Sequence, residues 1–88
     1  MDQYTYQEEL RAALAILAPL SDQASISGEG VAIFLSVGRA ARGIELYRHA
    51  DRVLIDRAVD GQLLGEREFA SFDAAVEAAK QWLSGTNE

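Results

Sequence analysis

The hydrophobic positions of this chain follow a helical period near both ends and a strand period between them. Near the N-terminus, leucines and alanines recur at intervals of three and four residues over positions 10–17. Thr5 and Glu8 have the spacing of a capping box, and Pro19 disfavours helical geometry in the residue before it. We therefore expect a helix over residues 6–18.

A second and clearer helical pattern covers residues 71–84. Its apolar stripe consists of Phe72, Ala75, Val76, Ala79 and Leu83. Ser71 can cap the first turn, and Gly85 can end the helix in a left-handed conformation. Trp82 lies beside the stripe, and we expect it to cover the edge of the core, a commoner role than that of a binding hot spot.

Between the helices, apolar and polar residues alternate with a period of two, which predicts β-strands. The segments with this pattern are residues 31–37, 44–49, 53–58 and 62–69. Residues 21–30 are predicted to form a loop, and whether residues 24–27 add a short strand stays open.

These elements predict an α+β fold with the order α-β-β-β-β-α. Short connections between successive strands favour a four-stranded antiparallel meander, and two amphipathic helices need a shared apolar surface, so we place both helices on one face of the sheet. The length of 88 residues suits a single domain, expected to span 1–88 with a flexible tail over 85–88. The predicted core comprises Leu10, Leu14, Leu17, Val31, Ile33, Leu35, Ile44, Leu46, Val53, Ile55, Leu63, Phe69, Phe72, Val76, Ala79 and Leu83.

The Asp60-Gly61 turn determines which side chains of the last two strands share a face. A two-residue loop would place Glu66 and Glu68 on the apolar face, which the pattern of the other strands disfavours. We therefore predict a three-residue loop in which Gly61 is left-handed and forms a G1 bulge. This register places two arginines on the core face, where we expect them at the rim with their guanidinium groups directed outward. These arginines are Arg57 and Arg67.

Composition and charge narrow the functional classes. The chain carries 14 acidic and 8 basic residues, for a net charge of −6, so it repels phosphate and favours basic partners. It has no cysteine, which excludes disulfides, thiolate metal sites and cysteine nucleophiles. No apolar run is long enough to cross a membrane and no signal peptide is recognisable, so we expect a cytoplasmic location and no membrane partner. The preference for arginine over lysine suits a GC-rich bacterial genome.

No constellation of side chains indicates catalysis or metal binding. His49 is the only histidine and has no second imidazole near it in the sequence, so we expect an exposed residue at a strand end. The carboxylates match no metal-binding motif, and we predict a protein that is not an enzyme and holds neither a metal nor a cofactor. Residues 38–43, GRAARG, predict a turn, in which Arg39 and Arg42 are a secondary candidate for anion binding beside the simpler interpretation of a soluble turn.

The α-β-β-β-α part of the predicted order resembles the double-stranded-RNA-binding fold. That family presents a lysine cluster at the start of its last helix, where this chain has Ser71-Phe72-Asp73-Ala74-Ala75, so we expect no nucleic-acid partner. In size, acidity and lack of cysteine, the chain is similar to bacterial inhibitors such as immunity proteins, which neutralise a basic toxin. This resemblance implies a non-enzymatic module for a basic protein partner, and a homodimeric structural or regulatory module is the alternative.

The predicted binding surface is the sheet face that the helices leave open. One predicted row of paired residues is Phe34, Tyr47, Arg52 and Glu68, and the next is Ser36, Glu45, Leu54 and Glu66, with Asp56 and Leu64 beyond it. This mixture of aromatic, aliphatic and acidic side chains often marks an interface. We expect the acids to steer a basic partner, or a second copy of the chain to bind the same face, with the aromatic side chains as anchors.

Overall fold

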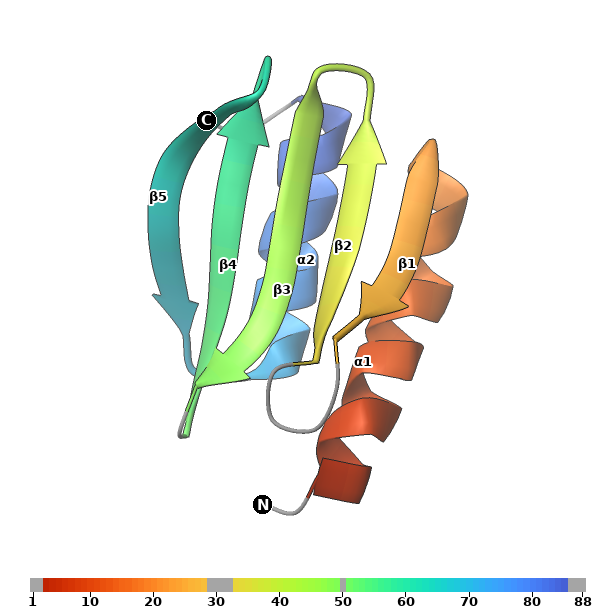
Figure 1. Ribbon diagram of the computed structural model, residues 1–88, viewed down its shortest axis with the longest axis vertical. Helices are drawn as coiled ribbons and strands as arrows, with labels where there is room; N and C mark the ends of the chain where they lie inside the picture. The colour runs from red at the N-terminus through yellow and green to blue at the C-terminus, as the bar shows by residue number, and fades with distance from the viewer. Residues whose placement is uncertain (1–2, 29–32, 50, 86–88) are drawn as a thin grey trace.

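The computed structural model describes residues 3–28, 33–49 and 51–85 and shows an α+β fold with one antiparallel sheet between two helices in the chain order. Its elements are α1 (Gln3–Leu17), the 3-10 turn η1 (Ala18–Leu20), β1 (Gln23–Ser27), β2 (Phe34–Arg39), β3 (Arg42–His49), β4 (Arg52–Val59), β5 (Gln62–Phe69) and α2 (Phe72–Ser84). The sheet has five strands in the order β1-β2-β3-β4-β5 (Figure 1), so the prediction of four strands is wrong.

The additional strand is β1, in the segment that the sequence left open. It pairs antiparallel with β2 and places Ile26 opposite Leu35 and Ala24 opposite Val37. Only these two residues of β1 are partly buried, and they pack against the core of larger side chains on β2. β1 has one large apolar residue in five positions, so apolar and polar residues hardly alternate along it. The strand therefore depends on its pairing with β2.

Both helices lie on one face of the sheet, as predicted, and they contact each other there. Figure 1 shows them behind the strands, with α1 toward the β1 edge and α2 across the middle. Ser71 caps α2 by accepting a hydrogen bond from the Ala74 N–H at 3.2 Å, and Gly85 ends it with a φ of 78°. The expected cap of α1 is wrong, because the helix already begins at Gln3 and Thr5 lies inside it.

The core lies between the helices and the sheet. Leu10, Leu17, Leu35, Leu46, Val53 and Ile55 are its largest fully buried side chains. Leu14, Ile33 and Phe69, also predicted to be in the core, are partly buried against it, and Val31 lies outside the described residues. Trp82 is 5% exposed and belongs to the core, together with Ala13, Val37 and Ala75.

The β4–β5 hairpin corrects the predicted loop. Val59 pairs with Gln62, and Asp60 and Gly61 both have positive φ, 53° and 80°, so the turn has two residues as in a type I′ turn. The register shift follows inside the strand, where the pairing passes from Leu63 directly to Gly65, whose φ is 101°. The bulge is therefore at Leu64 and Gly65 rather than at the turn.

This displaced bulge explains why Leu63 is not in the core. The predicted bulge preceded Leu63, but the actual one follows it, and a shift of one residue changes the face of a side chain. Leu63 thus pairs with Ala58, shares the face that the helices do not cover, and is 76% exposed. Beyond the bulge the predicted faces hold, with Glu66 and Glu68 on the uncovered side.

Candidate functional site

Three rows of side chains cross the face of the sheet that the helices do not cover, here called the outer face, and His49 and Arg52 pair beyond them at the ends of β3 and β4. One row is Tyr47, Leu54 and Glu68, with Phe34 near it at the start of β2. The middle row is Ser25, Ser36, Glu45, Asp56 and Glu66. The third row is Gln23, Gly38, Gly43, Ala58 and Leu63. The outer face thus divides into an aromatic and aliphatic row, a hydroxyl and acidic row, and a row of mostly small residues.

The predicted register between β3 and β4 is off by two residues. Tyr47 pairs with Leu54 rather than with Arg52, because His49 and Arg52 pair at the ends of the two strands. A shift of two residues keeps each side chain on its face. The predicted register between β4 and β5 is off by two residues as well, since Glu68 pairs with Leu54 rather than with Arg52. The Arg52 side chain nevertheless reaches Glu68, with 3.0 Å between Nη1 and Oε2, and both side chains are more than half exposed. Such a surface ion pair contributes little to stability.

Tyr47, Asp56 and Glu66 form a cluster at the centre of the outer face. The Tyr47 hydroxyl donates a hydrogen bond to Glu66 Oε2. Burial raises the pKa of the Tyr47 phenol above its usual value, and the hydrogen bond to Glu66 raises it further, so the phenol stays protonated. Burial and then the charge of Glu66 raise the pKa of Asp56, whereas a hydrogen bond from Tyr47 acts in the opposite direction.

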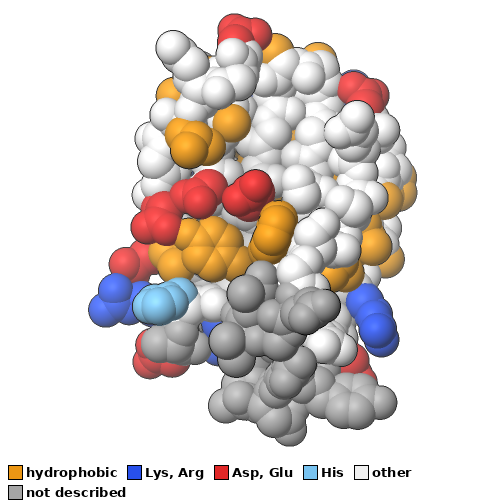
Figure 2. Space-filling view, viewed as in Figure 1, with side chains coloured by type: hydrophobic (Ala, Val, Ile, Leu, Met, Phe, Trp, Pro, Cys, Tyr) orange, Lys and Arg blue, Asp and Glu red, His pale blue; other side chains and the backbone are white. Residues whose placement is uncertain are grey.

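A small apolar patch lies beside this cluster. Leu54 is only 7% exposed although it is on the outer face, apart from the core that the helices cover. Tyr47, its partner across the strands, and Phe34 are half-buried. Figure 2 shows apolar side chains directly beside a band of acidic ones on this face. The outer face therefore carries a packed apolar patch directly beside a band of acidic side chains.

A groove crosses the outer face over its middle and third rows. Glu45 and Asp56 line one part of it, Leu63 another, and its floor includes Gly38 and Gly43. A Cβ atom added at Gly43 would lie in ordinary contact with the Val37 carbonyl oxygen, at 3.5 Å, so the glycine leaves open a space that a side chain would fill. The groove is not apparent from the sequence, because its only signal there is that small residues occupy the same side of neighbouring strands.

Leu64 and the two arginines of the GRAARG segment are not part of the acidic cluster. Leu64 belongs to the bulge and is 46% exposed. Arg39 and Arg42 pair at the ends of β2 and β3, so most of this segment is strand rather than turn. Arg42 donates to the Trp82 carbonyl oxygen at 3.2 Å and lies 4.3 Å from the centre of the Trp82 ring. Arg42 therefore joins β3 to α2.

At the tip of the β2–β3 hairpin, the side-chain carboxylate of Asp22 accepts a hydrogen bond from the backbone. The Ala40 N–H donates to Asp22 Oδ2 at 2.8 Å, and the Asp22 N–H donates to the Gly38 carbonyl oxygen at 2.7 Å. An external anion would compete with Asp22 for the Ala40 N–H. Anion binding at Arg39 and Arg42 stays a prediction.

The described residues contain no group of three or more histidine, cysteine, aspartate or glutamate side chains arranged to hold a metal ion. His49 is exposed at the end of β3. None of the described helices is both long and apolar enough to cross a membrane. No protein-family model, curated protein or solved structure matches the chain.

Proposed function

We propose that this protein is a non-enzymatic binding module that holds a basic protein partner on its outer face, in the manner of an immunity-type inhibitor. The observation that carries the proposal is the packed apolar patch around Leu54 beside the acidic cluster of Asp56 and Glu66. An uncovered face with an apolar patch beside charged side chains has the composition of a protein interface.

Each part of the outer face supplies a different contribution to binding. Glu45, Asp56 and Glu66 lie in one row, and their field raises the rate of encounter with a positively charged surface. Tyr47 is half-buried and hydrogen-bonded to Glu66, so burying its remaining surface against a partner costs little side-chain entropy. The groove beside them offers space for a side chain of the partner.

Self-association through the same face is less favourable than binding of a basic partner. Two copies facing each other would bring two acidic rows together in an interface that excludes water, and like charges repel strongly there. The net charge of −6 adds repulsion between copies at long range. We therefore expect a foreign partner with a basic surface.

The test is capture of partners from a lysate of the source organism by the wild-type protein and two outer-face variants. Phe34→Ser with Tyr47→Ser removes the aromatic anchors, and Glu45→Gln with Glu66→Gln removes charge. We expect the wild type to retain a basic protein that is released by raised salt, and both variants to lose it. Far-UV circular dichroism establishes that each variant is folded.

The matched control is Asp73→Asn with Glu77→Gln, which removes the same charge from exposed positions of α2. This control should retain the partner as the wild type does. Equal capture by all variants would refute a site on the outer face. Light scattering tests the alternative of a homodimer. If the wild type is a dimer and the double variant Phe34→Ser with Tyr47→Ser is a monomer, the outer face mediates self-association instead.

A further inference from the structure

The groove on the outer face is large enough for one side chain of a partner. Its volume is about 260 Å³, slightly below the ~300–1,000 Å³ of sites that hold whole small molecules. By contrast, the space beside Arg57 and Arg67 on the opposite side of the sheet is about 10 Å³, which a single water molecule fills. Of these two hollows, only the groove has room for an incoming side chain.

The lining of the groove is apolar at one end and acidic at the other. Leu63, which is 76% exposed, and Ala58 form the apolar end and pair with each other across β4 and β5. Glu45 and Asp56 form the acidic end and pair across β3 and β4. Asp56 and Ala58 are two residues apart on β4, so about 7 Å separates the two ends. A side chain that matches this lining has an apolar stem and a cationic head.

Two glycines leave the floor of the groove without side chains. Gly38 and Gly43 pair with each other across β2 and β3, and neither has a positive φ. A Cβ atom added at Gly38 or Gly43 would lie 3.7 or 3.5 Å from the nearest backbone carbonyl oxygen, which is ordinary contact. Neither backbone conformation nor crowding therefore requires glycine here, and what the two glycines produce is the open groove.

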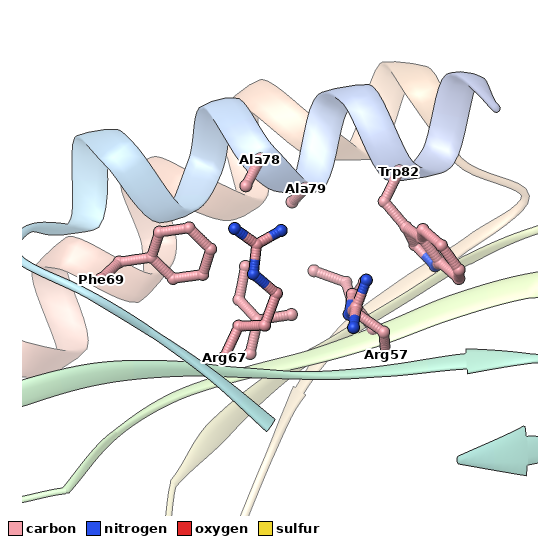
Figure 3. A pocket seen from close by; sticks show the side chains of 8 residues that line it. Arg57, Arg67, Phe69, Ala78, Ala79 and Trp82 are labelled. Carbon is pink, nitrogen blue, oxygen red and sulfur yellow. The ribbon is translucent and has the colours of Figure 1, made fainter. Parts of the chain in front are cut away.

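The carboxylates at the acidic end have no cation of the chain beside them. Neither Glu45 nor Asp56 forms an ion pair within the described residues, which include all eight lysine and arginine residues of the chain. Arg57 follows Asp56 on β4, and adjacent residues of a strand point to opposite faces. Figure 3 shows Arg57 and Arg67 projecting from the sheet toward α2. These two cations therefore lie across the sheet from the acidic end of the groove.

Repulsion among the carboxylates favours a cation from outside the chain. Asp56 has Glu45 opposite it on β3 and Glu66 opposite it on β5. Like charges directly opposite each other destabilise a sheet. Burial and then the charge of Glu66 raise the pKa of Asp56, as expected for a carboxyl crowded by another acid. A cation bound beside Asp56 would relieve this repulsion, whereas a neutral side chain would not.

Resting on the proposed function, we propose that the basic partner inserts an arginine side chain into the groove, with its guanidinium group between Glu45 and Asp56. The planar fork of N–H donors can engage both carboxylates at once, whereas the ammonium of lysine is compact and strongly hydrated. The aliphatic stem of arginine lies along Ala58 and Leu63, as such stems commonly lie on apolar surface. Arginine is also enriched in protein interfaces, where lysine is depleted.

The test uses N-acetylarginine methylamide and its lysine and citrulline counterparts as probes, added to the isotope-labelled protein. Citrulline keeps the length and the planar end of arginine but carries no charge. Binding is followed by nuclear magnetic resonance through the backbone amides of Gly43, Asp56 and Ala58. We expect saturable shifts at these amides with the arginine probe, weaker binding of the lysine probe and no binding of the citrulline probe.

Two variants test whether the arginine probe binds in the groove. Asp56→Asn removes one carboxylate and should weaken binding about fivefold or more, because a hydrogen bond to a charged group is lost. Ala58→Leu fills the apolar end and should abolish binding. Asp73→Asn, a matched loss of charge on α2, and Ala15→Leu, a matched enlargement on α1, are at exposed positions and should bind as the wild type does. The amide spectrum of each variant establishes that it is folded.

Two results of the titrations would overturn the proposal. One is the absence of saturable shifts with the arginine probe, or binding of the lysine or citrulline probe as tight as that of arginine. The other is arginine binding that Asp56→Asn and Ala58→Leu leave unchanged, or that the two controls weaken equally.

A failure of the groove is distinguishable from a failure of the proposed function. The titrations need no partner, so they test the groove whatever the lysate contains. Capture of a basic protein that Phe34→Ser with Tyr47→Ser abolishes and Ala58→Leu leaves intact would support the outer face as the binding surface. The same result would overturn the insertion of an arginine side chain into the groove.

Discussion

Trp82→Phe is the substitution that most directly tests how α2 is attached to the sheet. Trp82 is buried near the end of α2, and its indole N–H donates to the Gly43 carbonyl oxygen on β3 at 3.2 Å. The guanidinium carbons of Arg42 and Arg57 lie 4.3 and 5.3 Å from the centre of its ring. Phenylalanine keeps an aromatic ring but removes the donor and reduces the surface that both arginines contact.

The expected loss has three contributions. The hydrogen bond contributes about 0.5–1.5 kcal/mol, and its absence also leaves the Gly43 carbonyl without this donor. Each cation–π contact of a partly exposed arginine contributes about 0.5–1 kcal/mol, part of which phenylalanine retains. The smaller ring leaves a cavity that costs about 1 kcal/mol more. Together these give a loss of about 2–4 kcal/mol, a large share of the roughly 4–13 kcal/mol expected for a domain of this length.

The assay is urea denaturation followed by far-UV circular dichroism, since the substitution removes the only tryptophan. Ile16→Ala, at a 49% exposed position of α1, is the control and should change the stability by no more than about 0.5 kcal/mol. Adding Arg42→Gln to both backgrounds completes a double-mutant cycle, and its expected coupling is smaller than the ~0.5–1 kcal/mol of a full cation–π contact, because phenylalanine retains part of that contact. A loss below about 0.5 kcal/mol for Trp82→Phe would refute the reasoning.

Two further predictions concern the core boundary and the acidic cluster. Ile55→Ala should destabilise the protein by about 2–5 kcal/mol and Leu63→Ala by less than about 0.5 kcal/mol, because the first residue is buried and the second exposed; equal urea midpoints would contradict this. The raised pKa of Asp56 means that the folded state binds its proton more tightly than the unfolded state, so this carboxyl contributes stability at low pH that is lost as pH rises. Asp56→Asn should therefore raise the urea midpoint at pH 7 and lose this advantage as pH falls below the usual aspartate range; a midpoint difference that does not vary with pH would contradict this.

Much of the architecture could be predicted from local signals. Ser71, Gly85 and the stripe between them define α2, because capping and amphipathicity act within a few residues. The faces of β2, β3 and β4 could likewise be predicted from alternation. These signals sufficed to place Tyr47 and Asp56 on the open side of the sheet, whereas the face of Glu66 was predicted from a bulge that lies elsewhere in β5.

The errors arise where the structure depends on contacts between distant residues. β1 forms because β2 offers a partner, and its own residues hardly alternate. Asp60 and Gly61 satisfy a two-residue turn locally, and the conflict with the faces of Glu66 and Glu68 is resolved inside β5, at Gly65. The groove arises from side chains on several strands, so no single segment of sequence could indicate it.

The order of the strands has a consequence for how the chain folds. Every pair of neighbouring strands in the sheet is also a pair of neighbours in the sequence, so each pairing closes only a short loop. Short loops cost little chain entropy, and topologies rich in local contacts fold fast. The contact between α1 and α2 is different, because it joins the first and the last element of the described chain, with all five strands between them in the sequence. The docking of α1 on α2 is therefore the step of assembly that restricts the chain over the longest distance.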